Sequence, residues 1–141
     1  MSDWEIRQAI RETIDGYSGA VGRLDMDAFL SFFLPDAEVA GVGALVGQSD
    51  PFVGHAGIRA GFGPAIGAMQ WIVQMNTTTS IELAEDPRSA RAVTNLVEMA
   101  QRPDAPQIVL IARYEDELAL TDAGWKFARR RLVPLRFSQV P

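Results

Sequence analysis

The chain has 141 residues, of which 48% are hydrophobic and 22% are charged, and its formal net charge at pH 7 is -5. This length suits one domain with one core, which we assign to residues 1–141. The negative charge argues against nucleic acid as a partner, and the lack of cysteine excludes disulfides and thiolate metal sites. No apolar run is long enough to span a bilayer, and the N-terminus lacks the pattern of a signal peptide. We therefore expect a cytoplasmic protein without a membrane partner.

The N-terminal segment has the pattern of an amphipathic helix. Ser2 and Glu5 have the spacing of a capping box, and apolar residues then recur every three or four positions. These residues are Ile6, Ile10, Ile14, Tyr17 and Val21. The pattern predicts a helix that buries this stripe against the rest of the domain.

A second, short helix is expected after Asp25, which can cap it. Its apolar residues are Phe29, Phe32 and Phe33, and Pro35 ends it. Residues 40–54 are glycine-rich, which is typical of an irregular strand or a covering loop. A third helix is predicted over 56–62. Its stop signals are Gly63 and Pro64.

Long runs rich in β-branched and aromatic residues fill the rest of the chain. They cover 71–83, 90–101, 108–120 and 125–137. The short turns between them predict an antiparallel meander. Strands of this length twist and curl, and a curled sheet covered by helices encloses a cavity. The predicted class is α+β, with a curved antiparallel sheet wrapped by about three N-terminal helices.

Several segments together resemble the SnoaL-like proteins of the nuclear transport factor 2 superfamily. They are YSGAVGRLDMDAFLSFFLPDAEV, GHAGI at Gly54–Ile58, and the pair ARYEDEL and GWKFARRRL. The resemblance implies a cone-shaped barrel that dimerises through its sheet and holds a small apolar organic ligand without a cofactor. Relatives include polyketide cyclases, dehydratases, isomerases, dehydrochlorinases, small subunits of ring-hydroxylating dioxygenases, and non-catalytic proteins. The fold alone therefore does not select an activity.

The resemblance also implies a catalytic dyad, formed by an aspartate at the end of the first helix and a histidine on the first long strand. Together they would act as an oriented general base. Alignment places Gly22 at the aspartate position and Gln74 at the histidine position. Glycine has no side chain, and a glutamine amide does not accept a proton at working pH. We therefore expect the usual dyad to be absent.

Three other residues are candidates for catalysis, namely Tyr17, Asp25 and Glu98. Tyr17 could donate a hydrogen bond to a developing oxyanion, or could simply belong to the core. Asp25 could be a pocket carboxylate, or only a helix cap. Glu98 lies among apolar residues and could be a base with a raised pKa, or a solvated residue on a half-exposed strand. We favour the structural interpretation for each, with Tyr17 in the pocket wall.

The predicted pocket combines aromatic and polar side chains. Its residues are Tyr17, Phe33, Trp71, Gln74, Thr78 and Arg113. A row of polar residues on one strand would share a face by alternation, either in the cavity or toward solvent. That row is Gln74, Asn76, Thr78 and Ser80. Arg113 could bind an anionic ligand group or pair with Glu98, and we favour surface pairing.

Two further residues are assigned structural roles. Arg130 is expected to form a salt bridge. His55 is the only histidine, and without an orienting partner we expect it on the surface at the start of the third helix. No paired histidine or cysteine ligands have metal-site spacing, so no metal is predicted.

Three hypotheses of function follow. The chain could be a lyase or isomerase of an enolisable apolar compound, with Tyr17 as donor and Asp25 or Glu98 as base. It could equally be a non-catalytic ligand-binding protein, given the missing dyad. It could also be an association subunit that supports a larger catalytic partner. The first hypothesis requires one of the two carboxylates to lie inside the cavity with Tyr17.

Overall fold

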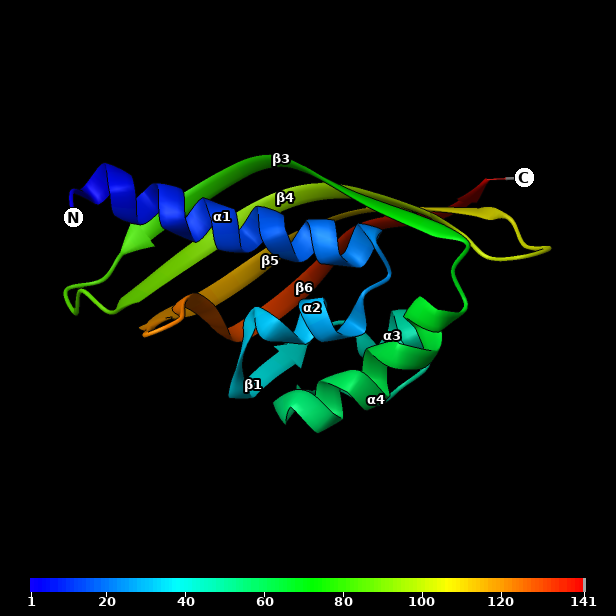
Figure 1. Cartoon of the computed structure of the whole chain (residues 1–141). Coiled ribbons are helices and arrows are strands. Elements are labelled where there is room, and N and C mark those ends of the chain that lie inside the picture. Colours follow the sequence, from blue (N-terminus) through cyan, green and yellow to red (C-terminus); the bar gives the residue numbers. More distant parts are fainter. Residues whose placement is uncertain (141) are drawn as a thin grey trace.

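The computed structural model describes residues 1–140 and shows an arched sheet with helices against its concave face (Figure 1). The helices are α1 (Asp3–Gly22), α2 (Met26–Ser31), α3 (Gly43–Val46) and α4 (Gly54–Gly67). The strands are β1 (Phe33–Ala40), β2 (Phe52–Val53), β3 (Trp71–Leu83), β4 (Ser89–Gln101), β5 (Gln107–Thr121) and β6 (Gly124–Val140). They form one sheet in the order β2-β1-β6-β5-β4-β3. The predicted α+β class with a curved antiparallel sheet is confirmed, except that β1 pairs with β6 in parallel.

Both predicted helix caps are present. Ser2 Oγ accepts a hydrogen bond from the Glu5 amide at 3.2 Å, and the Glu5 carboxylate accepts one from the Ser2 amide at 2.7 Å. Asp25 Oδ1 accepts a hydrogen bond from the Ala28 amide at 3.0 Å, at the start of α2. Each cap satisfies an amide that the first helical turn leaves unpaired.

The segment after α2 differs from the prediction. Phe33 does not continue the helix but begins β1, which runs parallel to β6. Pro35 is accommodated because the pairing with β6 is interrupted between Phe33 and Glu38, and a proline cannot donate a ladder hydrogen bond. Residues 40–54, expected to form an irregular strand or a covering loop, contain the short helix α3 and the two-residue strand β2.

Helix α4 is longer than predicted and runs through both expected stop signals, Gly63 and Pro64. Phe62 and Ile66 lie on either side of these residues and are both buried. Burial of this face outweighs the local preference to end the helix. Nearer its start, Gly61 leaves room for the Phe52 ring, since a Cβ at this position would lie 2.5 Å from the nearest ring atom.

The four long strands follow the prediction closely, and β3 has the predicted bounds. One irregularity matters for the site. The pairing of β3 with β4 shifts between Asn76 and Thr78, so that Thr77 is an extra residue in β3. Such a bulge reverses the alternation of side chains beyond it. Thr79 therefore faces the helices, where its hydroxyl lies 3.3 Å from the hydroxyl of buried Thr94.

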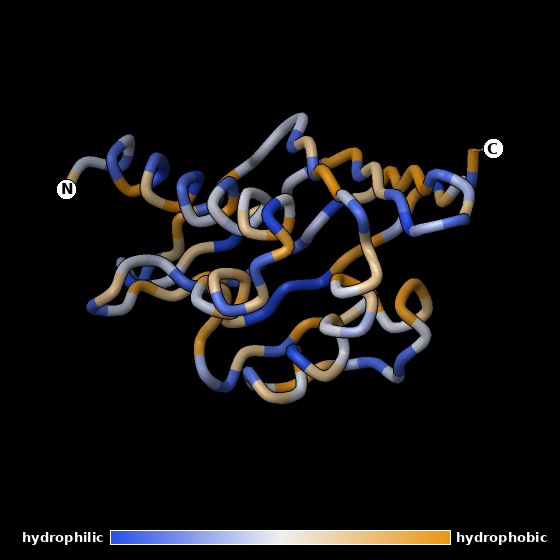
Figure 2. Tube along the Cα trace, turned by 45° about the vertical axis from the view of Figure 1, so that its right-hand side comes forward, coloured by the Kyte–Doolittle hydropathy of each residue, from blue (hydrophilic) through white to orange (hydrophobic). Residues whose placement is uncertain are grey.

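The core lies between the concave face of the sheet and helices α1, α2 and α4. Short apolar and polar stretches alternate along the whole trace (Figure 2), as expected for strands and helices that bury one face. Within residues 1–140, no helix has both the length and the apolar character needed to cross a membrane.

Candidate functional site

A cavity of about 450 Å³ lies inside the cone, between the sheet and the helices. This volume is in the range of small-molecule sites. Its wall is mainly apolar and includes Val21, Phe29, Phe62, Ile66, Met69, Ile72, Ala100, Ile108, Leu110 and Leu132. Among residues 1–140, the polar side chains in the wall are Tyr17, Gln74, Glu98, Arg102 and Tyr114. The concave face therefore encloses a hollow with a small polar region.

Glu98 lies on the cavity side of β4, directly opposite Gln74 on β3. Gln74 Nε2 donates a hydrogen bond to Glu98 Oε1 at 2.8 Å. Burial raises the pKa of the Glu98 carboxyl above its usual range, and the hydrogen bond from Gln74 opposes this rise. The structure therefore places Glu98 in the cavity wall, and not on a solvated face.

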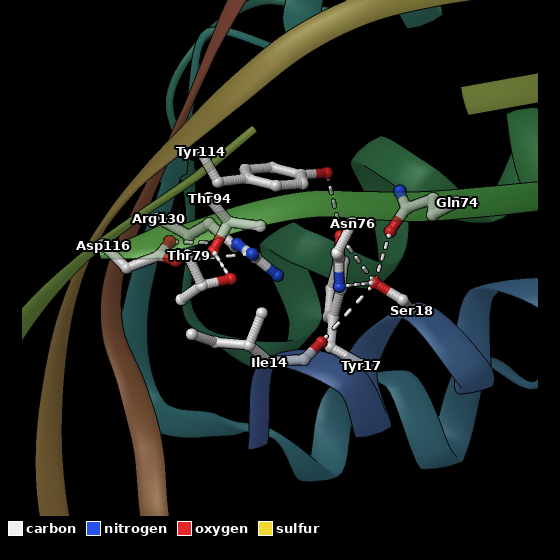
Figure 3. Close-up of polar contacts among 10 residues, drawn as sticks. All are labelled: Ile14, Tyr17, Ser18, Gln74, Asn76, Thr79, Thr94, Tyr114, Asp116 and Arg130. Carbon is white, nitrogen blue, oxygen red and sulfur yellow. Dashed lines mark hydrogen bonds and ion pairs between the residues drawn. The ribbon is translucent and has the colours of Figure 1, made fainter. Parts of the chain in front are cut away.

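A chain of side chains between α1 and β3 fixes the Gln74 amide (Figure 3). Ser18 Oγ donates to Gln74 Oε1 at 3.2 Å, which directs the amide nitrogen toward Glu98. Asn76 Nδ2 in turn donates to Ser18 Oγ at 3.2 Å and to Asp15 Oδ1 at 3.0 Å. The orientation of the Glu98 carboxylate is therefore set by a series of hydrogen bonds that ends at Asp15, an exposed residue of α1.

Tyr17 and Tyr114 place their hydroxyl groups together in the cavity wall. The two oxygens are 3.3 Å apart (Figure 3), and both side chains are buried. Burial raises the pKa of both hydroxyls, and the nearby charge of Glu98 also raises both, while Arg130 opposes the rise. Both groups are therefore protonated at neutral pH and can donate a hydrogen bond to a bound molecule.

Tyr114 was not among the predicted site residues. The sequence did carry a signal for Tyr114, because the apolar residues Leu110, Ala112 and Leu118 lie even numbers of positions away from it in β5. All three are buried in the structure. The alternation of a strand places such residues on one face. A pairing of Tyr114 with Tyr17 could not be read from the sequence, since it depends on how α1 lies across the sheet.

Arg130 forms the expected salt bridge, but in the interior. Its Nε lies 3.0 Å from Asp116 Oδ1 without hydrogen-bond alignment, and Nη2 donates to Asp116 Oδ2 at 3.3 Å. The guanidinium lies over the rings of Tyr17, Tyr114 and Phe127, at 4.2, 3.6 and 4.2 Å from their centroids. Burial raises the pKa of Asp116 to about 6, against the opposing effect of Arg130. Arg130 thus supports the tyrosine pair from behind the cavity wall.

Two residues predicted at the site lie outside the cavity wall. Asp25 is exposed and caps α2, as its structural interpretation proposed. Phe33 is buried in an aromatic cluster, with its ring centroid 5.8 Å from that of Tyr17 and 5.3 Å from that of Phe127. Asp25 therefore cannot serve as the cavity base, and Phe33 contributes only to the core beside it.

Three other predicted pocket residues face away from the cavity, for reasons of strand parity. Trp71 has the opposite parity to buried Ile72 and is 40% exposed. Thr78 lies beyond the bulge in β3, faces outward and accepts a hydrogen bond from Asn95. Arg113 is on the convex face and pairs with Glu115 of the same strand at 3.2 Å, not with Glu98. These placements correct the predicted pocket.

His55 lies at the start of α4, half-buried, with Nε2 3.0 Å from the carbonyl oxygen of Phe33. This contact ties α4 to β1, and His55 does not line the cavity. Within the described part of the chain, no three His, Cys, Asp or Glu side chains lie close enough to hold a metal ion together.

A curved α+β cone with a hollow interior is the architecture of the nuclear transport factor 2-like proteins, and one family model within this class matches the chain. The model is that of the SnoaL-like domain and matches residues 2–131. The chain therefore belongs to the SnoaL-like domain family. No curated protein matches the sequence.

Several solved structures are similar to this chain. One, named an aromatic ring hydroxylase from Novosphingobium aromaticivorans, has 28% identity and a TM-score of 0.88, covering 99% of this chain and 96% of that one. Another, named a scytalone dehydratase from the same species, has 18% identity and a TM-score of 0.84, covering 96% of this chain and 87% of that one. Hexachlorocyclohexane dehydrochlorinase LinA-type3 from Novosphingobium barchaimii has 15% identity and a TM-score of 0.79, covering 95% and 89%. The last two similarities show the fold alone.

Proposed function

We propose that this protein binds a small, mainly apolar organic molecule in the cavity and acts on it as a cofactor-independent lyase or isomerase. The observation that carries the proposal is the presence of Glu98 and the Tyr17–Tyr114 pair in one apolar hollow. A carboxyl with a raised pKa and two protonated hydroxyls are the groups that proton abstraction beside a carbonyl requires.

The chemistry assigns one role to each group. The Glu98 carboxylate takes a proton from the carbon next to a carbonyl, and the electrons of the broken C–H bond form the double bond of an enolate. The charge that develops on the oxygen is held by the tyrosine hydroxyls. In an isomerisation, the enolate takes the proton back from Glu98 at another carbon. In an elimination, it expels a leaving group from the neighbouring carbon, and the proton left on Glu98 passes to water.

The alignment of Gly22 and Gln74 with the family dyad supports a relocated base. Gly22 and Gln74 occupy the two dyad positions in our alignment, and neither can accept a proton. Glu98 is the cross-strand neighbour of Gln74. The base would therefore have moved by one strand, from β3 to β4, and the amide at the former histidine position would now orient it.

Two alternatives rest on specific observations. Gly22 and Gln74, which our alignment places at the dyad positions, cannot accept a proton, and this favours a non-catalytic ligand-binding protein. The similarity to a structure named an aromatic ring hydroxylase, together with exposed apolar residues on the convex sheet face, favours an association subunit. Both alternatives keep the cavity but assign Glu98 no proton transfer.

We also propose that the protein forms a homodimer through its sheet and is located in the cytoplasm. Met75, Val97 and Ile111 are cross-strand neighbours on the convex face. Met75 is 42% exposed and Ile111 39%. Contiguous apolar surface of this kind is typical of an association site, and a second copy of the chain would cover it through the same patch.

Deuterium exchange tests the catalytic proposal. A panel of small enolisable ketones, halides and hydroxy-compounds is incubated with the protein in D₂O and followed by proton NMR. We expect exchange or turnover with the wild type and a loss of at least about a hundredfold in Glu98→Gln. Asp25→Asn is the matched control, because asparagine also caps helices, and it should retain full activity.

The outcomes separate the hypotheses. Binding without exchange by the wild type would support the ligand-binding alternative and exclude the enzyme. Equal activity of Glu98→Gln and the wild type would exclude Glu98 as the base.

A further inference from the structure

The polar groups of the cavity are divided between two places. Glu98, Gln74 and the tyrosine pair lie together, and Arg102 lies apart from them at the end of β4. Arg102 is the one cationic side chain in the cavity wall among residues 1–140, and it is exposed to solvent. It therefore stands where the cavity opens.

The backbone around Arg102 is held in place. Gln101 Nε2 donates hydrogen bonds to the carbonyl oxygens of Arg102 and Ala105, at 2.9 and 2.5 Å, across the turn between β4 and β5. The Arg102 guanidinium itself makes no hydrogen bond or ion pair with residues 1–140. A positioned cation with free donors can bind an anion in two-pronged fashion.

The distance between Glu98 and Arg102 sets the length of a ligand that can contact both residues. Glu98, Ala100 and Arg102 alternate toward the cavity, so the Cα atoms of Glu98 and Arg102 are about 13 Å apart at the usual rise of a strand. The wall between them consists of apolar residues such as Ala100, Ile108 and Leu110. An elongated apolar body can fill this interval, with one polar group at each end.

The geometry points to an amphipathic substrate that carries a carboxylate at the end of an apolar, ring-sized body opposite its carbonyl. Arg102 binds the carboxylate at the mouth, and the carbonyl meets the tyrosine hydroxyls beside Glu98. A monoanion fits because one cation stands at the mouth, while the other charged group of the wall, Glu98, is kept distant by the apolar interval. This inference rests on the proposed function and makes Arg102 the residue that selects among its substrates.

A matched pair of probes tests the inference by calorimetry. Acetylnaphthoate, with its acetyl and carboxylate groups at opposite ends of the rings, is compared with acetylnaphthalene, which lacks the carboxylate. We expect Arg102→Gln to weaken acetylnaphthoate binding about tenfold, which is about 1.4 kcal/mol, and to leave acetylnaphthalene binding unchanged. Arg102→Lys should retain part of the affinity, because it keeps the charge but not the planar fork.

Arg91→Gln is the control, since Arg91 lies on β4, the strand that Arg102 directly follows, but outside the cavity wall. It should change neither affinity. Equal weakening of both probes by Arg102→Gln, or the same loss in Arg91→Gln, would overturn the role of Arg102 while acetylnaphthalene binding still supported the proposed function. Failure of both probes to bind the wild type would reject the inference and the cavity's ligand-binding role together.

Discussion

Gln74 and Glu98 face each other across β3 and β4, and the amide of Gln74 donates a 2.8 Å hydrogen bond to the carboxylate of Glu98. Gln74, which our alignment places at the histidine position of the family dyad, thus adjoins a carboxyl group on the next strand. In our proposal, this pairing lets a residue that cannot accept a proton still take part in proton transfer by orienting a neighbour that can.

Replacing Gln74 by leucine should raise the pKa of Glu98 further. The hydrogen bond from Gln74 stabilises the charged carboxylate and so lowers the pKa against the effect of burial. The pKa can be measured from the carbon-13 chemical shift of the Glu98 carboxyl as a function of pH. Ser18→Ala should cause a smaller shift in the same direction, because it only loosens the amide. An unchanged pKa in Gln74→Leu would show that the hydrogen bond does not tune Glu98.

Replacing Glu98 by glutamine should change the dependence of stability on pH. The folded pKa of Glu98 lies above its ordinary value of 4.5, so the folded state binds more protons than the unfolded state between these two pKa values. Its favourable contribution is complete below the unfolded pKa and is lost as pH rises through the folded pKa. Relative to the wild type, Glu98→Gln should therefore gain stability as pH rises from the unfolded value of 4.5 through the folded pKa of Glu98, measured by urea unfolding. A relative loss over this interval would contradict the assignment.

Replacing Arg130 by methionine should destabilise the fold by about 3–5 kcal/mol, because it leaves the Asp116 carboxylate buried without its partner. The double variant Arg130→Met/Asp116→Leu should cost much less than the sum of the two single changes. Urea unfolding of all four proteins gives the interaction energy. Strictly additive costs would show that the two side chains do not stabilise each other.

Filling the cavity tests whether it is hollow. Ala100 is buried and lines the cavity, so Ala100→Leu should leave stability within about 0.5 kcal/mol of the wild type and reduce acetylnaphthalene binding more than about tenfold. Ala112 is equally buried but does not line the cavity. Ala112→Leu should therefore cost about 1–3 kcal/mol through overpacking. If both variants lost the same free energy of unfolding, the space beside Ala100 would be filled with side chains and not hollow.

Replacing Ile111 by glutamate should separate the proposed homodimer, because it places a charge in the centre of the convex apolar patch. Sedimentation velocity measures the oligomeric state. Trp4→Glu is the control, since Trp4 is 71% exposed on α1, which packs on the concave side of the sheet. A wild-type monomer, or a dimer that persists in Ile111→Glu, would refute this interface.

The sequence was sufficient for most of the fold, because caps and periodicities are local. Ser2 and Asp25 cap the predicted helices, and β3 has its predicted bounds. The parallel pairing of β1 with β6 was not predictable from local pattern, since Phe33 contacts strand residues that are distant in the sequence. Tertiary burial also carried α4 past Pro64, where local propensity alone predicts an end.

The site was less predictable, because it depends on facing directions and not on element type. Side chains alternate between the two faces along β4 and β5, and this alternation directs Glu98 and Tyr114 toward the interior. Both positions could have been predicted from the sequence. The outward position of Thr78 depends on the extra residue in β3, which leaves no mark in a single sequence. The contact between Tyr17 and Tyr114 depends on the crossing of α1 over the sheet.

The extra residue Thr77 also gives β3 one place where its length can change. Asn76, Thr78 and Thr79 pair with Leu96, Asn95 and Thr94, which are consecutive residues of β4. Deleting Thr77 would therefore leave a continuous ladder with these pairs kept, and Ile81 and Leu83 would still pack against the core. Deleting Ser80 with the bulge kept would instead turn Ile81 and Leu83 to water, so the tolerance of this strand to a lost residue depends on which side chain is removed.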